Sequence, residues 1–376
     1  MTTDLAAPPK PTAPATTLER RRRPQERSVE STYVLVGSAA SSLGLVWVIF
    51  ERLLPLSGVL GFWLCWYAVF VVMYCILSAM QWGHHAVTDR LASVLFHTAG
   101  VVVVSALLFV VGYTGFRGYH ALRPSFFTQT MASTGPLDPL TQGGVAHAMV
   151  GSLEQVALAL LFSVPLGITT ALFLNEVRGP LARPVRTIVD AMSAIPSIVA
   201  GLFVLATVIL TFGYNKCGLA AAAAIAVEML PVITRAAEVV FRLVPGGLRE
   251  ASLALGATQW RTVWRVVIPT ARAGLATAVV LGIARGIGET APVLLVAGFT
   301  SEMNKDPLHG AQVSLPLYIF NYVKYPQAAM ITRAWGAGLA LLAIVLILFI
   351  TARLLGGQGP GKLTRRQRRR LTRAAG

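Results

Sequence analysis

Residues 91–116 are LASVLFHTAGVVVVSALLFVVGYTGF, an uncharged apolar run with Arg90 before it and Arg117 after it. About 20 consecutive apolar residues are enough for a helix to cross the hydrocarbon core of a bilayer. The sequence therefore predicts an all-α polytopic membrane helix bundle. Its expected transmembrane helices, about eight in number, lie at residues 31–50, 53–80, 91–116, 146–175, 187–213, 217–240, 270–298 and 333–352.

The composition favours a lipid environment for the whole chain. Of its 376 residues, 55% are hydrophobic and 13% are charged, whereas an ordinary soluble domain has about 25% charged residues. The net charge of +16 does not indicate nucleic-acid binding, because the basic residues lie between apolar segments and in two tails, without interleaved aromatic residues. Three cysteines in or beside apolar runs, with no CxxC pair, are expected to be reduced packing residues.

The distribution of Lys and Arg predicts the orientation. Residues 1–30 are rich in Pro, Ala and Thr and contain a run of arginines, which is typical of a disordered basic tail. If this tail is cytoplasmic, 24 of the 32 Lys and Arg residues lie inside and 7 outside, with Arg285 within a span. Basic residues concentrate on the cytoplasmic side of membrane proteins. We therefore expect a multi-pass protein of the cytoplasmic (inner) membrane. Both termini, including the second basic tail at 356–376, are expected in the cytoplasm.

Catalytic motifs are not found in the sequence. The segment 356–361 followed by Lys362 imitates a phosphate-binding loop, but Leu363 stands where Ser or Thr would bind magnesium. No nucleophile, base and acid set and no metal-ligand spacing is recognisable. We expect no catalytic residue, no metal and no cofactor in this chain, so that any ATP and magnesium used for transport bind to a partner.

One predicted cytoplasmic connection, at about 244–269, has a pattern of its own. Proline near each end and glycine at position 256 predict a compact helical elbow between two spans. Its spacing is Glu250-Ala251-Ser252, three residues, Gly256, nine residues, then Val266-x-Ile268-Pro269. This resembles the EAA loop of ABC-transporter permeases, and the resemblance implies that Arg249, Glu250, Ala251 and Gly256 contact the ATPase subunit. The alternative is an ordinary amphipathic helix at the membrane surface.

Further motifs bring the resemblance closest to the phosphate-uptake permeases of the PstA family, over residues 91–355. They are AIPSIV at 194–199, GLF at 201–203, the stretch 230–269, Ala-Arg at 284–285 and GETAP at 288–292. The resemblance implies a PstC-like permease, a PstB-like ATPase dimer and an external PstS-like phosphate-binding protein as partners. Such permeases usually have six spans, so residues 31–80 are expected to form two additional N-terminal helices.

Arg285 and Glu289 need a functional explanation, because an arginine in a membrane span costs roughly 2.5 to 3.5 kcal/mol on insertion scales. A guanidinium supplies a fork of donors that matches phosphate oxygens. With the resemblance, this places Arg285, Glu289 and Thr290 on the substrate path. A buried structural pair is the alternative. Glu154, Asp190 and Glu228 are further acids within spans that could pair with Arg285.

Two local features of the same region are expected to be structural. Gly282 and Gly286 have the spacing of close helix packing, and Pro292 is expected to kink the helix beside Glu289 because it removes a hydrogen bond.

The sequence thus predicts the permease subunit of an ABC importer that carries inorganic phosphate into the cell. One alternative is a permease for another oxyanion, such as sulfate or molybdate. Another is a non-transporting membrane scaffold that senses phosphate by contacting a kinase. A membrane-embedded enzyme comes third.

Overall fold

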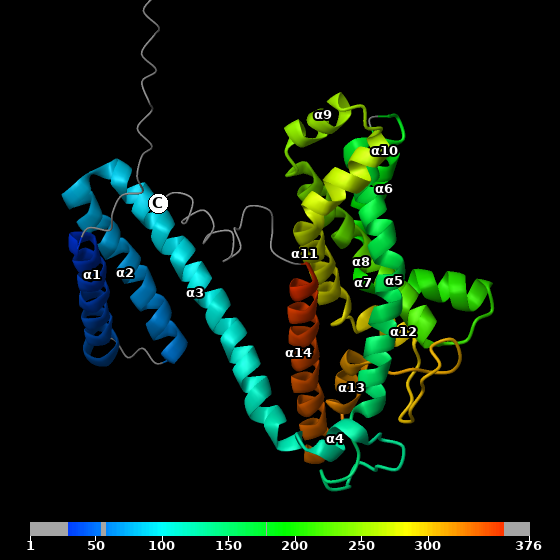
Figure 1. The fold of residues 1–376 in the computed structure, drawn as a ribbon. Coiled ribbons are helices and arrows are strands. Elements are labelled where there is room, and N and C mark those ends of the chain that lie inside the picture. Colours follow the sequence, from blue (N-terminus) through cyan, green and yellow to red (C-terminus); the bar gives the residue numbers. More distant parts are fainter. Residues whose placement is uncertain (1–28, 54–57, 178, 357–376) are drawn as a thin grey trace, which may run out of the picture. The chain divides into compact units, whose positions relative to one another are not determined.

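The computed structural model describes residues 29–53, 58–177 and 179–356, and every regular element in these ranges is helical (Figure 1). Seven helices in the described part are long and apolar enough to cross a membrane, and a bent helix pair raises the number to eight. The prediction of an all-α polytopic bundle is therefore confirmed. The predicted tails at 1–30 and 356–376 lie almost entirely outside the described residues.

The chain divides into two compact units, Met1–Leu108 and Phe109–Gly376. The boundary falls inside α3 (His84–Gly118), whereas the sequence suggested a boundary between 80 and 91. Residues 101–111 of α3 all have exposed side chains, so they add little to the packing of either unit. Such an apolar, uncovered surface suits contact with lipid.

The first unit contains an antiparallel helix pair. Its elements are α1 (Val29–Val48), the π-helical segment η1 (Ile49–Leu53), α2 (Val59–Trp82) and α3 as far as Leu108. Trp66 Nε1 of α2 donates a hydrogen bond to the carbonyl oxygen of Ala39 in α1 at 3.2 Å. Phe70, Tyr74 and Val94 form the small buried cluster of this unit. These contacts fix the two additional N-terminal helices against each other.

The second unit is built around α8 (Figure 1). Its long helices are α5 (Ala146–Glu176), α8 (Gly218–Arg242), α11 (Ile268–Gly286) and α14 (Ala328–Gly356). Its short elements are η2 (Tyr119–Ala121), α4 (Pro124–Thr128), α6 (Ala182–Ala194), α7 (Ser197–Val204), η3 (Leu205–Thr211), α9 (Gly246–Ala254), α10 (Gln259–Thr262), η4 (Val263–Val267), α12 (Ala291–Val296) and α13 (Leu315–Tyr322).

Glycines bring α11 against α8. A Cβ atom added at Gly282 would lie 2.6 Å from Ile233 Cγ1, and one at Gly286 would lie 2.5 Å from Met229 Sδ. Both distances are too short for a real side chain, so the predicted packing role of these two glycines is confirmed. The Ala-rich start of α8 is buried in the same core.

Two of the expected spans are broken. The predicted span at 187–213 consists of α6 and of α7 with η3, which meet at an angle of 108°. The reason is Pro196, which disfavours a helical conformation at the residue before it, and Ile195 is extended (φ −70°, ψ 126°). The predicted span at 270–298 ends earlier, at Gly286, and resumes as α12. Pro292 therefore accompanies a complete break, larger than the expected kink.

The predicted elbow at 244–269 is present but shorter. Helix α9 ends at Ala254, and Gly256 has a φ of +79°, a left-handed conformation that glycine adopts most easily. After Gly256 the chain becomes helical again at Gln259 and continues through η4 and Pro269 into α11. Proline is tolerated there because it occupies the first turn of α11.

Candidate functional site

A three-residue ion-pair cluster lies where α11 is interrupted. Nη2 of Arg285 lies 2.7 Å from Oε2 of Glu228, and its Nη1 lies 3.1 Å from Oε1 of Glu289. Glu228 lies on α8, about 15 Å from the start of that helix at 1.5 Å per residue. One guanidinium thus bridges two carboxylates from separate segments of the chain.

The interruption after α11 explains the positions of Arg285 and Glu289. Arg285 lies in the last turn of α11, where a cation interacts favourably with the unpaired carbonyl groups. Glu289 lies in the connection to α12, and its backbone N–H donates to the carbonyl oxygen of Gly286 at 3.2 Å. Non-helical backbone at membrane depth is tolerated where protein buries it or where it lines a cavity. The break therefore shows that this position is not part of a uniform span.

The three side chains differ in exposure. The Arg285 side chain is 49% exposed, whereas those of Glu228 and Glu289 are 6% and 10% exposed. Oε1 of Glu228 is buried and has no hydrogen-bond partner. The guanidinium is thus the group that an approaching molecule reaches first, and the carboxylates lie beneath it.

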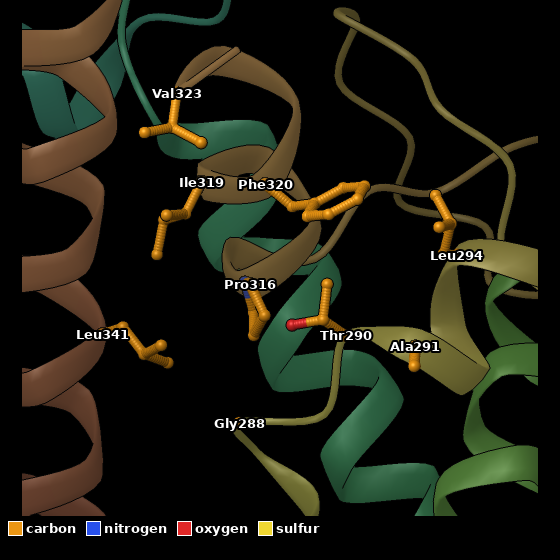
Figure 2. A pocket seen from close by; sticks show the side chains of 9 residues that line it. All are labelled: Gly288, Thr290, Ala291, Leu294, Pro316, Ile319, Phe320, Val323 and Leu341. Carbon is orange, nitrogen blue, oxygen red and sulfur yellow. The ribbon is translucent and has the colours of Figure 1, made fainter. Parts of the chain in front are cut away.

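Thr290, the third residue predicted for the substrate path, faces a different space. It lines a pocket of about 490 Å³ between α12, α13 and α14 (Figure 2), in which it is the sole polar side chain. The other lining residues are Gly288, Ala291, Leu294, Pro316, Ile319, Phe320, Val323 and Leu341. This apolar pocket suits a hydrocarbon chain better than an anion. Arg285 does not line this pocket, and the role of Thr290 in the path stays a prediction.

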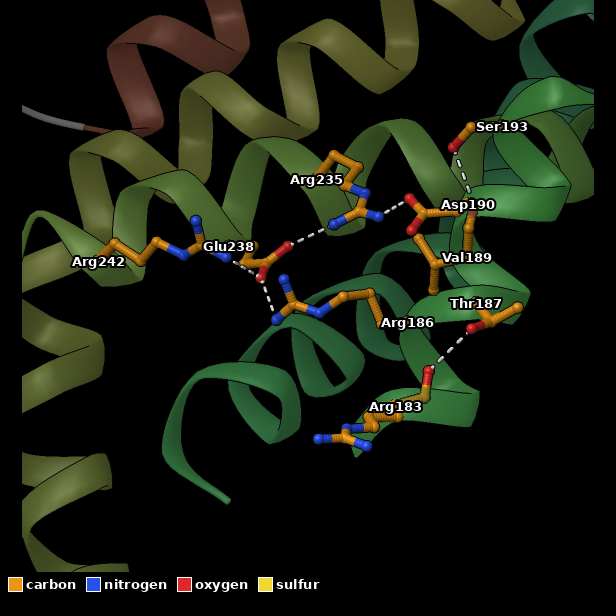
Figure 3. A network of polar contacts seen from close by, with 9 residues as sticks. All are labelled: Arg183, Arg186, Thr187, Val189, Asp190, Ser193, Arg235, Glu238 and Arg242. Carbon is orange, nitrogen blue, oxygen red and sulfur yellow. Dashed lines mark hydrogen bonds and ion pairs between the residues drawn. The ribbon is translucent and has the colours of Figure 1, made fainter. Parts of the chain in front are cut away.

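A second ion-pair cluster lies further along α8 (Figure 3). Glu238 is buried and is contacted by Arg186 of α6 at 2.8 Å, by Arg235 at 2.9 Å and by Arg242 at 2.5 Å. Arg235 also pairs with Asp190 of α6. These contacts fasten α6, the first half of the bent span, to the end of α8 that leads into the elbow.

The predicted coupling residues have two different environments. Nη2 of Arg249 lies 2.9 Å from Oε1 of Glu176 and donates to the carbonyl oxygen of Phe241 at 3.0 Å. Arg249 therefore holds the elbow on α5 and α8. Glu250, Ala251 and Gly256 are exposed, and so are large apolar side chains near them, at Leu253, Leu255 and Trp260. This exposed surface is available for a partner.

The sequence does not predict several of these contacts. Glu228 was one of three acids that could pair with Arg285, and nothing favoured it over Glu154, which accepts a hydrogen bond from Gln312 instead. The spacing of Glu228, Arg235, Glu238 and Arg242 at intervals of seven, three and four residues was a usable signal, since it places all four near one face of a helix.

Arg333 was expected only at the outer edge of a span, yet it is fully buried in α14. Its Nη2 donates hydrogen bonds to the carbonyl oxygens of Asp138, Pro139 and Gln142, at 2.8 to 3.1 Å. Arg333 thus fastens the loop after α4 to α14.

The architecture so far is that of a polytopic membrane protein, with broken helices around an ion-pair site and a separate helical elbow. The family model "Binding-protein-dependent transport system inner membrane component" matches residues 163–357, more than half of the chain. The match includes the elbow and all members of both ion-pair clusters. The chain belongs to this family.

Within this family, the chain is similar in sequence to individual phosphate transport permeases. It is 39% identical to "Phosphate transport system permease protein PstA 1" of Mycobacterium tuberculosis (strain CDC 1551 / Oshkosh), over 72% of this chain and 88% of the relative. It is 38% identical to the PstA permease of Mycobacterium leprae, over 69% and 85%, and 32% identical to that of Yersinia pestis, over 71% and 89%. These relatives share most of their length with this chain.

Solved structures of ABC transporters are similar to parts of the fold. An inward-facing MetNI methionine transporter matches with a TM-score of 0.44 and 23% identity, over 57% of this chain and 93% of that chain. A bacterial importer of the polysaccharide alginate matches with a TM-score of 0.47 and 15% identity, over 71% and 97%.

Proposed function

We propose that this chain is the permease subunit of an ABC importer that carries inorganic phosphate across the cytoplasmic membrane into the cell. The observation that carries the proposal is the half-exposed guanidinium of Arg285, held above two nearly buried carboxylates at a break in α11. The names of the relatives, which are phosphate transport permeases, agree with this chemistry.

Arg285 is suited to bind an oxyanion that has left water. Removing phosphate from water is costly unless charged donors replace its hydration shell, and a guanidinium offers five N–H groups in a planar fork. Two of its nitrogens contact Glu228 and Glu289, which hold the side chain in place when the path is empty. The half-exposed side chain is then proposed to bind substrate through its remaining N–H groups.

The energy for transport is proposed to come from a partner. The elbow, exposed around Glu250, Leu253 and Leu255, is proposed to dock on a PstB-like ATPase dimer, which binds ATP and magnesium. A PstC-like permease completes the path, and a PstS-like binding protein delivers phosphate from outside. This arrangement requires the elbow and both termini to lie in the cytoplasm.

Uptake of radiolabelled phosphate by cells lacking the gene tests the proposal. Reintroducing the wild-type gene should restore uptake, and the purified chain should carry the ATPase with it. Strong competition by sulfate or molybdate would instead indicate a permease for another oxyanion. Normal uptake in the deletion strain would contradict transport and indicate a scaffold that senses phosphate through a kinase.

A further inference from the structure

The charges of the Arg285 cluster are unusual for a site that takes an anion. The single guanidinium faces two carboxylates, and among the described residues no second cation has an ion pair with either Glu228 or Glu289. Fully ionised, the cluster therefore has a net charge of −1. A simple electrostatic trap for anions would have an excess of cations, so the carboxylates require an explanation beyond holding Arg285.

The positions of the carboxylates put them within reach of whatever binds to Arg285. Glu228 and Glu289 each lie within 3.1 Å of a terminal nitrogen of the guanidinium, so both carboxylates flank the same cation. An oxyanion that takes the remaining N–H groups of the same planar fork is thereby brought beside a carboxylate oxygen. Carboxylates accept hydrogen bonds and donate none when ionised.

One of these oxygens lacks a donor. Oε1 of Glu228 is buried without a hydrogen-bond partner, on a side chain that is 6% exposed. A buried acceptor without a donor is unfavourable, and a bound ligand that carries a donor would satisfy it. The hydroxyl group of a protonated oxyanion is such a donor.

We propose that Glu228, assisted by Glu289, makes the Arg285 site selective for oxyanions that carry a hydroxyl hydrogen. This selectivity rests on the proposed function. The hydroxyl hydrogen is the group that distinguishes phosphate from oxyanions of the same shape. Phosphate near neutral pH carries one or two hydroxyl hydrogens, and one can be donated to Glu228 while the remaining oxygens accept from Arg285. Sulfate has no hydrogen to donate, so its oxygens are repelled by both carboxylates. Arsenate resembles phosphate in this respect and should be accepted.

Equilibrium binding of radiolabelled phosphate to the transporter complex, purified without the external binding protein, tests this selectivity at the permease itself. Unlabelled arsenate should displace the label about as well as phosphate, and sulfate roughly tenfold or more less well, the scale of one hydrogen bond to a charged group. In Glu228→Gln the amide adds donors and removes the charge, so the disadvantage of sulfate should largely disappear. Glu302→Gln, the same change at an exposed loop position, is the matched control and should keep it.

The outcomes separate the inference from the proposed function. If Glu228→Gln does not assemble, Glu289→Gln provides the same comparison, with a smaller expected loss of selectivity. Phosphate binding with unchanged discrimination in both assembled variants, or equal displacement by sulfate in the wild type, would overturn the inference and leave phosphate transport intact. Absence of phosphate binding to the wild-type complex would overturn both.

Discussion

The two ion-pair clusters on α8 both consist of Glu and Arg side chains, but in opposite proportions. Near the middle of the helix, Glu228 and Glu289 share the single guanidinium of Arg285. Ten residues further on, about 15 Å along the axis, Glu238 is shared by Arg186, Arg235 and Arg242. The first cluster has an acceptor to spare, and the second has an excess of donors. We infer that the first is arranged to receive a ligand and the second to fasten helices.

Exposure supports this division of roles. In the Glu238 cluster every contact ties one buried acid to partners on α6 and α8, and Asp190 takes a further contact from Arg235. In the Arg285 cluster the half-exposed cation covers two buried acids, and one acid oxygen is unpaired. Removing one arginine should therefore have very different consequences in the two places.

The largest effect is expected from removing the cation of the first cluster. Arg285→Gln should reduce phosphate uptake by about 30-fold or more, because losing one partner of a buried charged contact costs about 2 to 5 kcal/mol in binding. Arg285→Lys should restore part of it, since the ammonium keeps the charge but lacks the fork. Initial uptake rates of labelled phosphate measure both.

Arg235→Gln is the matched control for this substitution. Glu238 keeps Arg186 and Arg242 as partners, so uptake should remain within a few-fold of wild type. Equal losses for Arg285→Gln and Arg235→Gln would remove the distinction between the clusters.

The next effect is on stability and belongs to the second cluster. Glu238→Gln leaves three guanidiniums close together without their shared acid, and the loss of hydrogen bonds to a charged group should cost about 1.5 to 3 kcal/mol. Asp190→Asn removes an exposed partner and should cost at most about 1 kcal/mol. Thermal unfolding of the purified chain compares the two variants. A larger loss for Asp190→Asn would contradict the fastening role of Glu238.

The elbow beyond the second cluster should respond to backbone conformation more than to size. Gly256 has a φ of +79° and no atom within 4 Å of an added Cβ, so the strain of a substitution comes from the left-handed conformation, about 1 to 2 kcal/mol. Gly256→Val should separate ATP hydrolysis from phosphate uptake, whereas Gly256→Asn should do so less, because asparagine tolerates this conformation. Similar coupling ratios in both variants would argue against the elbow as the coupling element.

The smallest effect is expected from cysteine substitutions that report sidedness, since exposed sites tolerate them. A cysteine at Leu255 of the elbow should react with a membrane-impermeant reagent only from the cytoplasm, and one at Leu137 only from outside, in a background without Cys65 and Cys75. Deleting residues 1–80 should keep this pattern because two spans are lost together. Labelling of both positions from the same side would contradict the predicted orientation of the chain.

Local patterns predicted much of this fold, because hydropathy and proline or glycine positions act over a few residues. They located most of the spans, the turn at Gly256 and the packing of Gly282 and Gly286, but not the breaks within two spans. They did not show that Glu228 is the nearer partner of Arg285, since the two are 57 residues apart in sequence and the pairing depends on how α8 meets α11. The inward direction of Arg249 was missed for the same reason, because its partner Glu176 belongs to α5.

We infer that Arg285 acts on the substrate and does more than neutralise its acidic neighbours. The most direct test of this inference is labelled phosphate uptake by the triple variant Arg285→Gln, Glu228→Gln and Glu289→Gln, in which no charge of the first cluster remains. We predict a chain that inserts, binds the ATPase and has a normal thermal stability, yet takes up no phosphate, because the desolvated anion has lost its cation. Recovery of uptake in this variant would show that Arg285 only balances buried charge and does not act on the substrate.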